Sequence, residues 1–229
     1  MKRVFCALAA LVFLAGCVEP VPSDGQARIM TMGDSMLAWN AASGRSVSDA
    51  LEARLGQPVV DRSVSGARYF YALPVSGSLG LRIDRQFVAG DWDWIVLNGG
   101  GNDLLFGCGC GRCDRQLDRL ISADASSGAI PALVARLRST GANVAYVGYL
   151  RTPGFRSPVE NCAEIGDALE ARLATLAALD KGVFFVSNRT LVPEGDRSFH
   201  DSDRLHPSAK GSAAIAARLA KVITGAGAR

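Results

Sequence analysis

The stretch RIMTMGDS, residues 28–35, predicts a buried strand that turns into a helix at its end. Arg28–Met32 is a short apolar run of the kind that parallel sheets bury. Gly33 suits a tight turn, and Asp34 is a residue type that caps helices. At such a turn a serine hydroxyl projects from the sheet edge, where helix amides stabilise negative charge. Ser35 is therefore a candidate nucleophile, with helix capping by Asp34 and Ser35 as the structural alternative.

Short apolar runs and longer amphipathic runs alternate along the rest of the chain. The expected strands are Arg28–Met32, Val59–Val64, Trp92–Asn98, Val144–Leu150 and Val183–Ser187. The expected helices are Ser46–Leu55, Arg115–Thr140 with a break at Pro131, Glu160–Leu179 and Ser208–Ile223. This alternation predicts an α/β fold, a three-layer α/β/α sandwich with a mostly parallel five-stranded sheet. Such sheets bind ligands at the carboxyl ends of their strands.

Composition and charge set the class of protein. The 229 residues are 48% hydrophobic and 21% charged, which is typical of one globular domain. The formal net charge is +3, and it falls to +1 once Lys2 and Arg3 are removed with the N-terminal segment described next. A nearly balanced charge argues against nucleic acid as the partner.

The N-terminal segment resembles the signal of a bacterial lipoprotein. Lys2 and Arg3 precede the apolar run Val4–Leu14, which at about eleven residues is too short to span a bilayer. The run ends in Leu-Ala-Gly-Cys, residues 14–17, which resembles the lipobox. The resemblance implies a signal peptide of residues 1–16, cut before a lipidated Cys17. The alternative is an ordinary secretory signal with an incidental cysteine.

The resemblance also implies a location. Val18 stands where an Asp would favour the inner membrane, so we expect an outer-membrane anchor that holds the protein on the periplasmic side. Residues 17–27 are rich in Pro, Gly and acids and form a flexible tether, which leaves residues 28–229 as the folded domain.

Four cysteines remain after Cys6 leaves with the signal peptide and Cys17 is lipidated. They are Cys108, Cys110, Cys113 and Cys162. In an oxidising compartment they predict two disulfides with three possible connectivities. A bridge within Cys-x-Cys is strained, so we expect a link from the CGCGRC cluster, residues 108–113, to Cys162. A four-cysteine zinc site is the alternative, although the spacing lacks two zinc knuckles.

Two further strand ends carry groups suited to binding an oxyanion. The second strand ends in VSGA, residues 64–67, where Gly66 lets a backbone amide approach a substrate. The third ends in NGGGND, residues 98–103, whose three glycines exclude a helix and bring the Asn102 amide to the strand end. The structural alternative for Gly66 is an ordinary glycine in a turn. The glycine run at residues 99–101 fits neither the G-x-G-x-x-G motif nor the lysine-containing phosphate-binding loop, so it does not indicate a nucleotide site.

The segment DRLHP, residues 203–207, supplies a candidate base. A carboxylate at Asp203 can reach the Nδ1–H of His206 and leave Nε2 free to accept a proton. His200, the other histidine, has Arg197 three residues before it and is the weaker candidate. A loop that caps the final helix is the structural alternative.

Taken in chain order, these four blocks resemble the SGNH or GDSL hydrolase family, with its flavodoxin-like fold. The resemblance covers about residues 28–224. It implies that Ser35 is the nucleophile, His206 the base and Asp203 the residue that orients it. The Ser35 and Gly66 amides and the Asn102 side chain would form the oxyanion hole.

The first block departs from the family pattern. Members often continue Gly-Asp-Ser-Leu and then Gly, whereas this chain reads MLAW at residues 36–39. Substrate preference therefore does not transfer with the motif.

The resemblance implies a serine esterase that works through an acyl-enzyme, without metal or organic cofactor. An envelope location favours short-chain or O-acetyl esters, with lysophospholipids or thioesters as the second choice. The alternative from another class is a non-catalytic lipoprotein of this fold that binds a glycan or a protein partner. The sequence does not indicate an oligomeric state.

Overall fold

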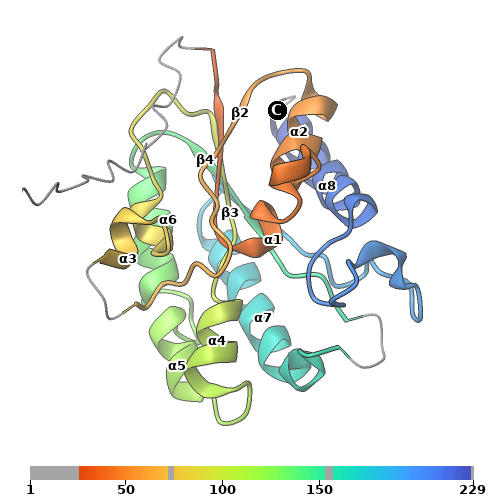
Figure 1. Ribbon diagram of the computed structural model, residues 1–229. Coiled ribbons are helices and arrows are strands. Elements are labelled where there is room, and N and C mark those ends of the chain that lie inside the picture. The colour runs from red at the N-terminus through yellow and green to blue at the C-terminus, as the bar shows by residue number, and fades with distance from the viewer. Residues whose placement is uncertain (1–25, 72–74, 153–156, 228–229) are drawn as a thin grey trace, which may run out of the picture.

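The centre of the fold is a sheet of five parallel strands (Figure 1). The computed structural model describes residues 26–71, 75–152 and 157–227. Its strands are β1 (Ile29–Met32), β2 (Val59–Asp61), β3 (Trp94–Leu97), β4 (Asn143–Val147) and β5 (Val183–Val186), in the order β2-β1-β3-β4-β5. Each strand overlaps an apolar run expected from the sequence. The predicted α/β sandwich with a five-stranded parallel sheet is confirmed.

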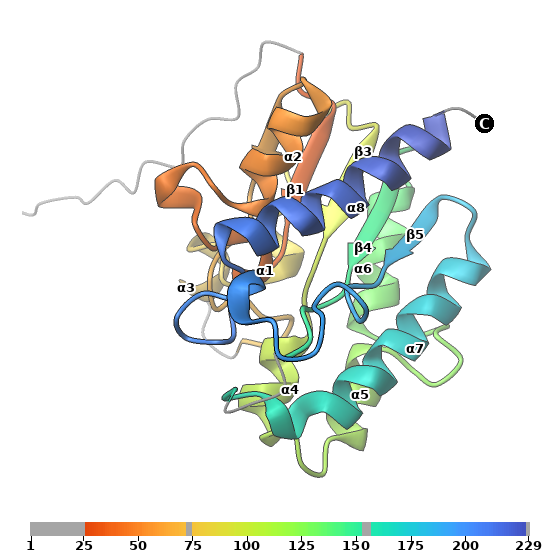
Figure 2. The same cartoon turned by 90° about the vertical axis from the view of Figure 1, so that its right-hand side faces the viewer.

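Helices cover both faces of this sheet. They are α1 (Ser35–Ala38), α2 (Val47–Leu55), α3 (Val75–Ser78), α4 (Gly101–Cys108), α5 (Asp114–Leu120), α6 (Ala129–Arg138), α7 (Ala163–Leu179) and α8 (Ala209–Gly227). Helices α2 and α8 lie together on one face and α6 on the other (Figures 1 and 2). In this part of the chain, no helix is both long and apolar enough to cross a membrane.

Alternation along the strands divides the core into two halves. In β1, Met30 and Met32 face the half that also contains residues of α6 and α7, whereas Ile29 faces the half with α2 and α8. Both faces of β1 are buried, which explains why its sequence is apolar throughout rather than alternating.

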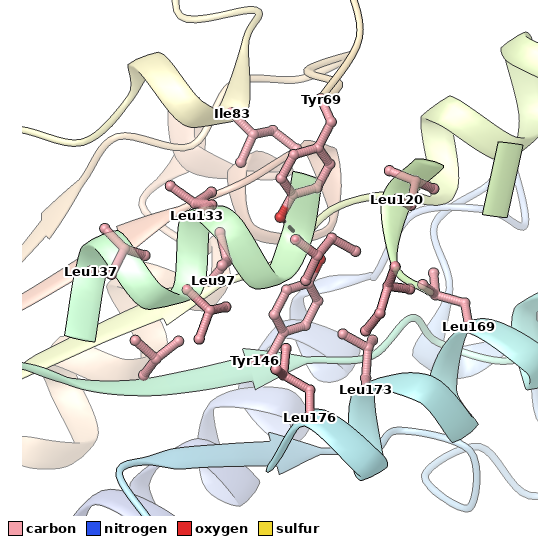
Figure 3. Close-up of a cluster of buried hydrophobic side chains, with 14 of the residues drawn as sticks. Tyr69, Ile83, Leu97, Leu120, Leu133, Leu137, Tyr146, Leu169, Leu173 and Leu176 are labelled. Atoms are coloured by element: carbon pink, nitrogen blue, oxygen red, sulfur yellow. Dashed lines mark hydrogen bonds between the residues drawn. The ribbon is translucent and has the colours of Figure 1, made fainter. Parts of the chain in front are cut away.

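The larger half of the core is packed by helix positions three or four residues apart (Figure 3). Its side chains include Leu133 and Leu137 of α6 and Leu169, Leu173 and Leu176 of α7. Two buried tyrosines in this half satisfy their hydroxyls together. The Oη atoms of Tyr69 and Tyr146 lie 3.2 Å apart, and Tyr146 donates to the carbonyl oxygen of Gly99 at 3.0 Å. Buried hydroxyls need such partners to offset the loss of water.

The expected helix from Arg115 to Thr140 is two helices, α5 and α6, separated by residues 121–128. The break does not fall at Pro131, which is the third residue of α6. That prediction was wrong because the first turn of a helix leaves its amides without partners inside the helix, so a proline there costs little.

The glycine run at residues 99–101 also behaves differently from the expectation. It does not exclude a helix, because α4 begins at Gly101, with Gly100 in the left-handed region at a φ of 95° as its N-cap. A Cβ at Gly101 would lie 2.6 Å from the Tyr149 ring, so glycine is needed for this close approach. The glycines start the helix and set Asn102 in its first turn.

The four cysteines of the folded domain form two disulfides. Cys108 pairs with Cys113, and Cys110 pairs with Cys162. The expected link from the cluster to Cys162 is confirmed. All four thiols are used, so the zinc alternative has no thiolates left. In the described ranges, no group of three His, Cys, Asp or Glu side chains is placed to hold a metal ion.

Candidate active site

The backbone around Ser35 is fixed at the carboxyl end of β1. Gly33 has a φ of 151°, and a Cβ there would lie 2.6 Å from the carbonyl oxygen of Asn98. The buried Gln86 side chain accepts from the Gly33 amide at 2.6 Å and donates to its carbonyl at 2.8 Å. Asp34 caps α1 by accepting from the Met36 amide at 2.9 Å. Capping therefore belongs to Asp34, and the hydroxyl of Ser35 has a different partner.

That partner is His206, which the structure brings to Ser35 from 171 residues away. His206 Nε2 lies 2.8 Å from Ser35 Oγ, and Nδ1 lies 2.5 Å from Asp203 Oδ2. The other Asp203 oxygen accepts from the amides of Leu205 and His206, both at 3.0 Å. Ser35, His206 and Asp203 are thus joined in one line of hydrogen bonds.

Asp203 stays ionised in this arrangement. Partial burial alone would raise its pKa, but the hydrogen bonds from the ring and amide of His206 and from the Leu205 amide lower the pKa below its usual value. A carboxylate at this position accepts a hydrogen bond from the Nδ1–H group of His206. It therefore fixes the tautomer in which Nε2 can accept a proton from Ser35.

Trp39 stacks on the imidazole of His206. The two ring centroids are 3.8 Å apart and the planes differ by 6°. The indole N–H donates to Asp201 Oδ2 at 2.8 Å, and this bond lowers the pKa of Asp201. Sequence reasoning treated Trp39 only as a departure from the family pattern. Its place one turn after Ser35 was the available signal, but the stacking depends on a loop that is distant in sequence.

Asn102 lies in the first turn of α4, which follows β3, and its side chain contacts the segment that follows β2. Its Nδ2 donates to the carbonyl oxygen of Ala67 at 3.1 Å. Gly66, with a φ of 79°, accepts from the Tyr71 hydroxyl at 2.7 Å. Ser35, Asn102 and His206 line one cavity, and Gly66 is not among the described residues that line it.

A buried carboxylate next to Asn102 holds the loop that follows Gly66. Asp103 accepts from the amides of Tyr69 at 3.0 Å and Phe70 at 2.9 Å. Burial raises the pKa of Asp103 to about 6, against the lowering effect of these two bonds. The Asn-Asp pair therefore ties α4 to this loop through two consecutive side chains.

A second buried carboxylate links the nucleophile to α4. The Tyr149 hydroxyl donates to Asp34 Oδ2 at 2.5 Å and accepts from the Gly101 amide at 2.8 Å. Burial raises the pKa of both Asp34 and Tyr149. Tyr149 follows β4 at the same sheet edge, which could have marked it in the sequence, but its partners follow two other strands, Gly101 after β3 and Asp34 after β1.

His200, the weaker candidate base, is placed differently. Its side chain is buried, and burial lowers its pKa. Its backbone forms an isolated β-bridge with Pro207, and its ring is hydrogen-bonded to the backbone of Arg151. The structure therefore brings together three of the residues proposed from the sequence, Ser35, Asp203 and His206, and Asn102 lines the same cavity as Ser35 and His206.

A parallel α/β sandwich with these residues at the carboxyl edge of its sheet defines a hydrolase of the SGNH class. The family model of the GDSL-like lipase/acylhydrolase family matches residues 31–214. The chain belongs to this family.

Solved structures agree on the fold. A GDSL-like lipase from Bacteroides thetaiotaomicron is 18% identical, with a TM-score of 0.58 over 87% of this chain and 88% of the other. An acetyl xylan esterase is 16% identical, with a TM-score of 0.61 over 85% and 98%. TesA is 19% identical, with a TM-score of 0.57 over 86% and 98%. Among curated proteins, none matches the chain.

Proposed function

We propose that this protein is a serine esterase that hydrolyses carboxylic esters through an acyl-enzyme. The observation that carries the proposal is the line of hydrogen bonds from Asp203 to His206 and from His206 to Ser35, at 2.5 and 2.8 Å. These distances allow proton transfer from the hydroxyl to the imidazole without rearrangement.

The first half-reaction forms the acyl-enzyme. Ser35 Oγ attacks the ester carbonyl carbon while His206 Nε2 takes the hydroxyl proton, and the carbonyl oxygen becomes an oxyanion. The tetrahedral intermediate then expels the alcohol, which receives the proton from His206. In the second half-reaction, His206 activates a water that hydrolyses the ester at Ser35.

The oxyanion is held by the Ser35 amide and the Asn102 side chain, which both line the cavity. The third donor implied by the family resemblance is the Gly66 amide, although Gly66 is not among the described lining residues. Ser35 is the first residue of α1, where backbone amides point toward the helix N-terminus and favour negative charge. The amide of Asn102 has two hydrogens, so its bond to Ala67 leaves one for the oxyanion.

The same contacts argue against a protein of this fold that only binds a glycan or a partner. A binding site does not require Asp203 to fix the tautomer of a histidine that faces a serine. We therefore favour an enzyme over a non-catalytic binding protein. The substrates proposed from the sequence are short-chain or O-acetyl esters of the cell envelope, with lysophospholipids or thioesters second.

Hydrolysis of p-nitrophenyl acetate by the wild type and by Ser35→Ala tests the proposal. We expect turnover by the wild type and near-complete loss in the variant, with an unchanged thermal midpoint. Turnover that survives in Ser35→Ala would assign the activity to another group. A folded wild type that is inactive on every ester would favour the binding protein.

The proposed envelope location rests on Cys17, which lies outside the described residues. Mass spectrometry of protein from a bacterial membrane fraction should find Cys17 as the lipidated first residue. Cys17→Ser should release an active domain. An unmodified N-terminus further along the chain would remove the anchor from the proposal.

A further inference from the structure

The cavity that contains Ser35 continues between α4, which carries Asn102 in its first turn, and α7, which carries no residue of the proposed catalytic site. Its volume is about 190 Å³. Arg151 and Thr152 line it together with the catalytic residues. Where the cavity passes between the two helices, its wall is mainly aliphatic, with Leu104 on α4 and Ile165 and Leu169 on α7. These three side chains are at most 9% exposed. The catalytic end of the cavity is polar, and the end between α4 and α7 is apolar.

A disulfide forms part of the wall of the apolar end. Cys110 and Cys162 both line the cavity, and their bond joins the segment after α4 to the residue before α7. Figure 2 shows the start of α7 beneath α4. The other disulfide, Cys108–Cys113, closes a span of five residues and does not line the cavity. One disulfide therefore fixes the distance between the two helices, and the other does not.

The volume is larger than an acetyl group needs. Apolar protein cavities of about 150 Å³ take up benzene, the size of about six carbons, whereas one water occupies about 30 Å³ in the liquid. An acetyl methyl is close in size to a water. The 190 Å³ includes the catalytic end of the cavity, so six to eight carbons, roughly, is the upper limit for the acyl chain that it accommodates.

The chemistry decides which part of the ester enters the apolar end. The carbonyl oxygen must face Asn102, and the departing oxygen must face His206 to receive its proton. The remaining substituent on the reacting carbon is the acyl chain. The space left for it, away from His206, is the apolar end between α4 and α7.

We propose that this end of the cavity binds a medium-length acyl chain, and that the Cys110–Cys162 disulfide is a specificity determinant that sets its width. This inference rests on the esterase function proposed above. It favours esters of about six to eight acyl carbons over the acetyl esters expected from the sequence. Burial of aliphatic carbon against Leu104, Ile165 and Leu169 supplies the binding energy.

A series of p-nitrophenyl esters from acetate to dodecanoate tests the chain length. The leaving group is constant, so kcat/KM reports the acyl chain. We expect kcat/KM to rise about fourfold for each added methylene up to hexanoate or octanoate, which corresponds to burial of each methylene, and then to fall. A value that falls steadily from acetate would overturn the acyl assignment.

Hexanoate esters of alcohols of increasing length give the complementary measurement. Because the alcohol lies on the His206 side, we expect kcat/KM to vary little with its length. A steep rise with alcohol length and none with acyl length would place the leaving group in the cavity instead.

The double variant Cys110→Ala/Cys162→Ala tests the disulfide, with Cys108→Ala/Cys113→Ala as the matched control. The readout is the ratio of kcat/KM for octanoate to that for acetate, measured below the thermal midpoint of each variant. We expect the ratio to fall about tenfold or more in the first variant and to stay at the wild-type value in the control. Equal ratios in all three proteins, or an equal fall in both variants, would remove the disulfide as a determinant.

Filling the cavity provides an independent variant. Gly166 lines the cavity from α7, and a Cβ there would lie 3.0 Å from Nη1 of Arg151, so a larger side chain must displace this guanidinium group slightly. Gly166→Leu should also favour α7, since leucine has the better helix propensity. We expect it to lower the octanoate-to-acetate ratio, and an unchanged ratio would contradict the pocket.

The two proposals fail in different ways. If no ester is hydrolysed, or Ser35→Ala keeps its activity, the esterase function itself is wrong. If acetate is hydrolysed through Ser35 and the acyl series and the variants show no length dependence, only the acyl pocket is wrong.

Discussion

The nucleophile and the base of the proposed site are held by opposite kinds of structure. Ser35 follows a buried strand, and its neighbours Gly33 and Asp34 are fixed by the buried side chain of Gln86 and the partly buried side chain of Tyr149. His206 lies in the irregular segment between the 3-10 helix Arg197–Phe199 and α8. On this side the Asp203 side chain is 35% exposed.

Different sets of contacts position the nucleophile and the base. The serine is positioned by the core of the fold, so its place depends on many contacts. The histidine is positioned by a few local ones: Asp203 on its Nδ1, Trp39 on its ring and the bond between its carbonyl and the Asp201 amide at 2.8 Å. Removing single contacts should therefore displace the histidine more readily than the serine.

The largest loss of kcat should come from replacing the nucleophile Ser35 or the base His206. Ser35→Ala and His206→Ala should each lower kcat for p-nitrophenyl acetate by about 10⁶-fold, since both act in one proton transfer. The double variant should lose little more. The measurement is kcat of the two single variants and the double variant. Losses that multiply would mean that the two sides act independently.

The variant Asn102→Ala tests the oxyanion donor that lines the cavity with Ser35. If its amide donates to the oxyanion, kcat should fall by about 10² to 10³-fold, or roughly 3 to 4 kcal/mol, with KM nearly unchanged. The bond to Ala67 gives the structural alternative, which is a lowered thermal midpoint with normal kcat. Both quantities measured on one preparation separate the two roles.

The stability of the serine side should depend on pH through Asp103. Its folded pKa is raised to about 6 from 3.8, so the native state binds the proton more tightly than the unfolded chain. This contribution is complete below about pH 4 and is lost as pH rises through 6, and amounts to about 3 kcal/mol.

Chemical unfolding of the wild type and Asp103→Asn between pH 4 and pH 7 measures this term. The wild type should lose up to about 3 kcal/mol of unfolding free energy relative to the variant over this range. The raised pKa of Asp34 acts in the same direction in both proteins, so it cancels. Parallel curves for the two proteins would show that Asp103 titrates normally.

The smallest effect should come from Trp39, on the histidine side. Trp39→Leu removes both the stack on His206 and the bond to Asp201, and should lower kcat about tenfold, because aromatic pairs contribute about 0.5 to 1.5 kcal/mol. Trp39→Phe keeps a ring and should recover part of kcat. KM and the thermal midpoint serve as controls, since a purely structural role would lower the midpoint and leave kcat intact.

Local patterns were the part of this fold that could be predicted from the sequence. The apolar strands and the Asp203–His206 pair depend on neighbours within a few residues, so their spacing was informative. The start of α4 was misjudged because three glycines usually disfavour a helix, whereas here Gly100 is the N-cap and Gly101 allows the approach of Tyr149. The break between α5 and α6 was misplaced because a proline in a first turn does not end a helix.

Contacts between distant segments could not be predicted. The stack of Trp39 on His206 and the bond of Tyr149 to Asp34 each join residues more than 100 positions apart. Neither Trp39 nor Tyr149 belongs to one of the sequence motifs. Only the folded sheet brings these two side chains to the carboxyl ends of its strands. For the same reason, the sequence did not decide which of the possible disulfide connectivities the four cysteines adopt.

That pairing has a consequence for how the protein matures. The two disulfides interleave in sequence, because Cys110 lies between Cys108 and Cys113 yet bonds to Cys162, 52 residues away. Short loops close most readily, so the first partners that Cys110 meets in an unfolded chain are the wrong ones. Native pairing then requires thiol–disulfide exchange after α7 has docked beside α4. Refolding with an oxidant alone should trap mispaired chains, whereas a glutathione redox buffer or a disulfide isomerase should recover the native protein.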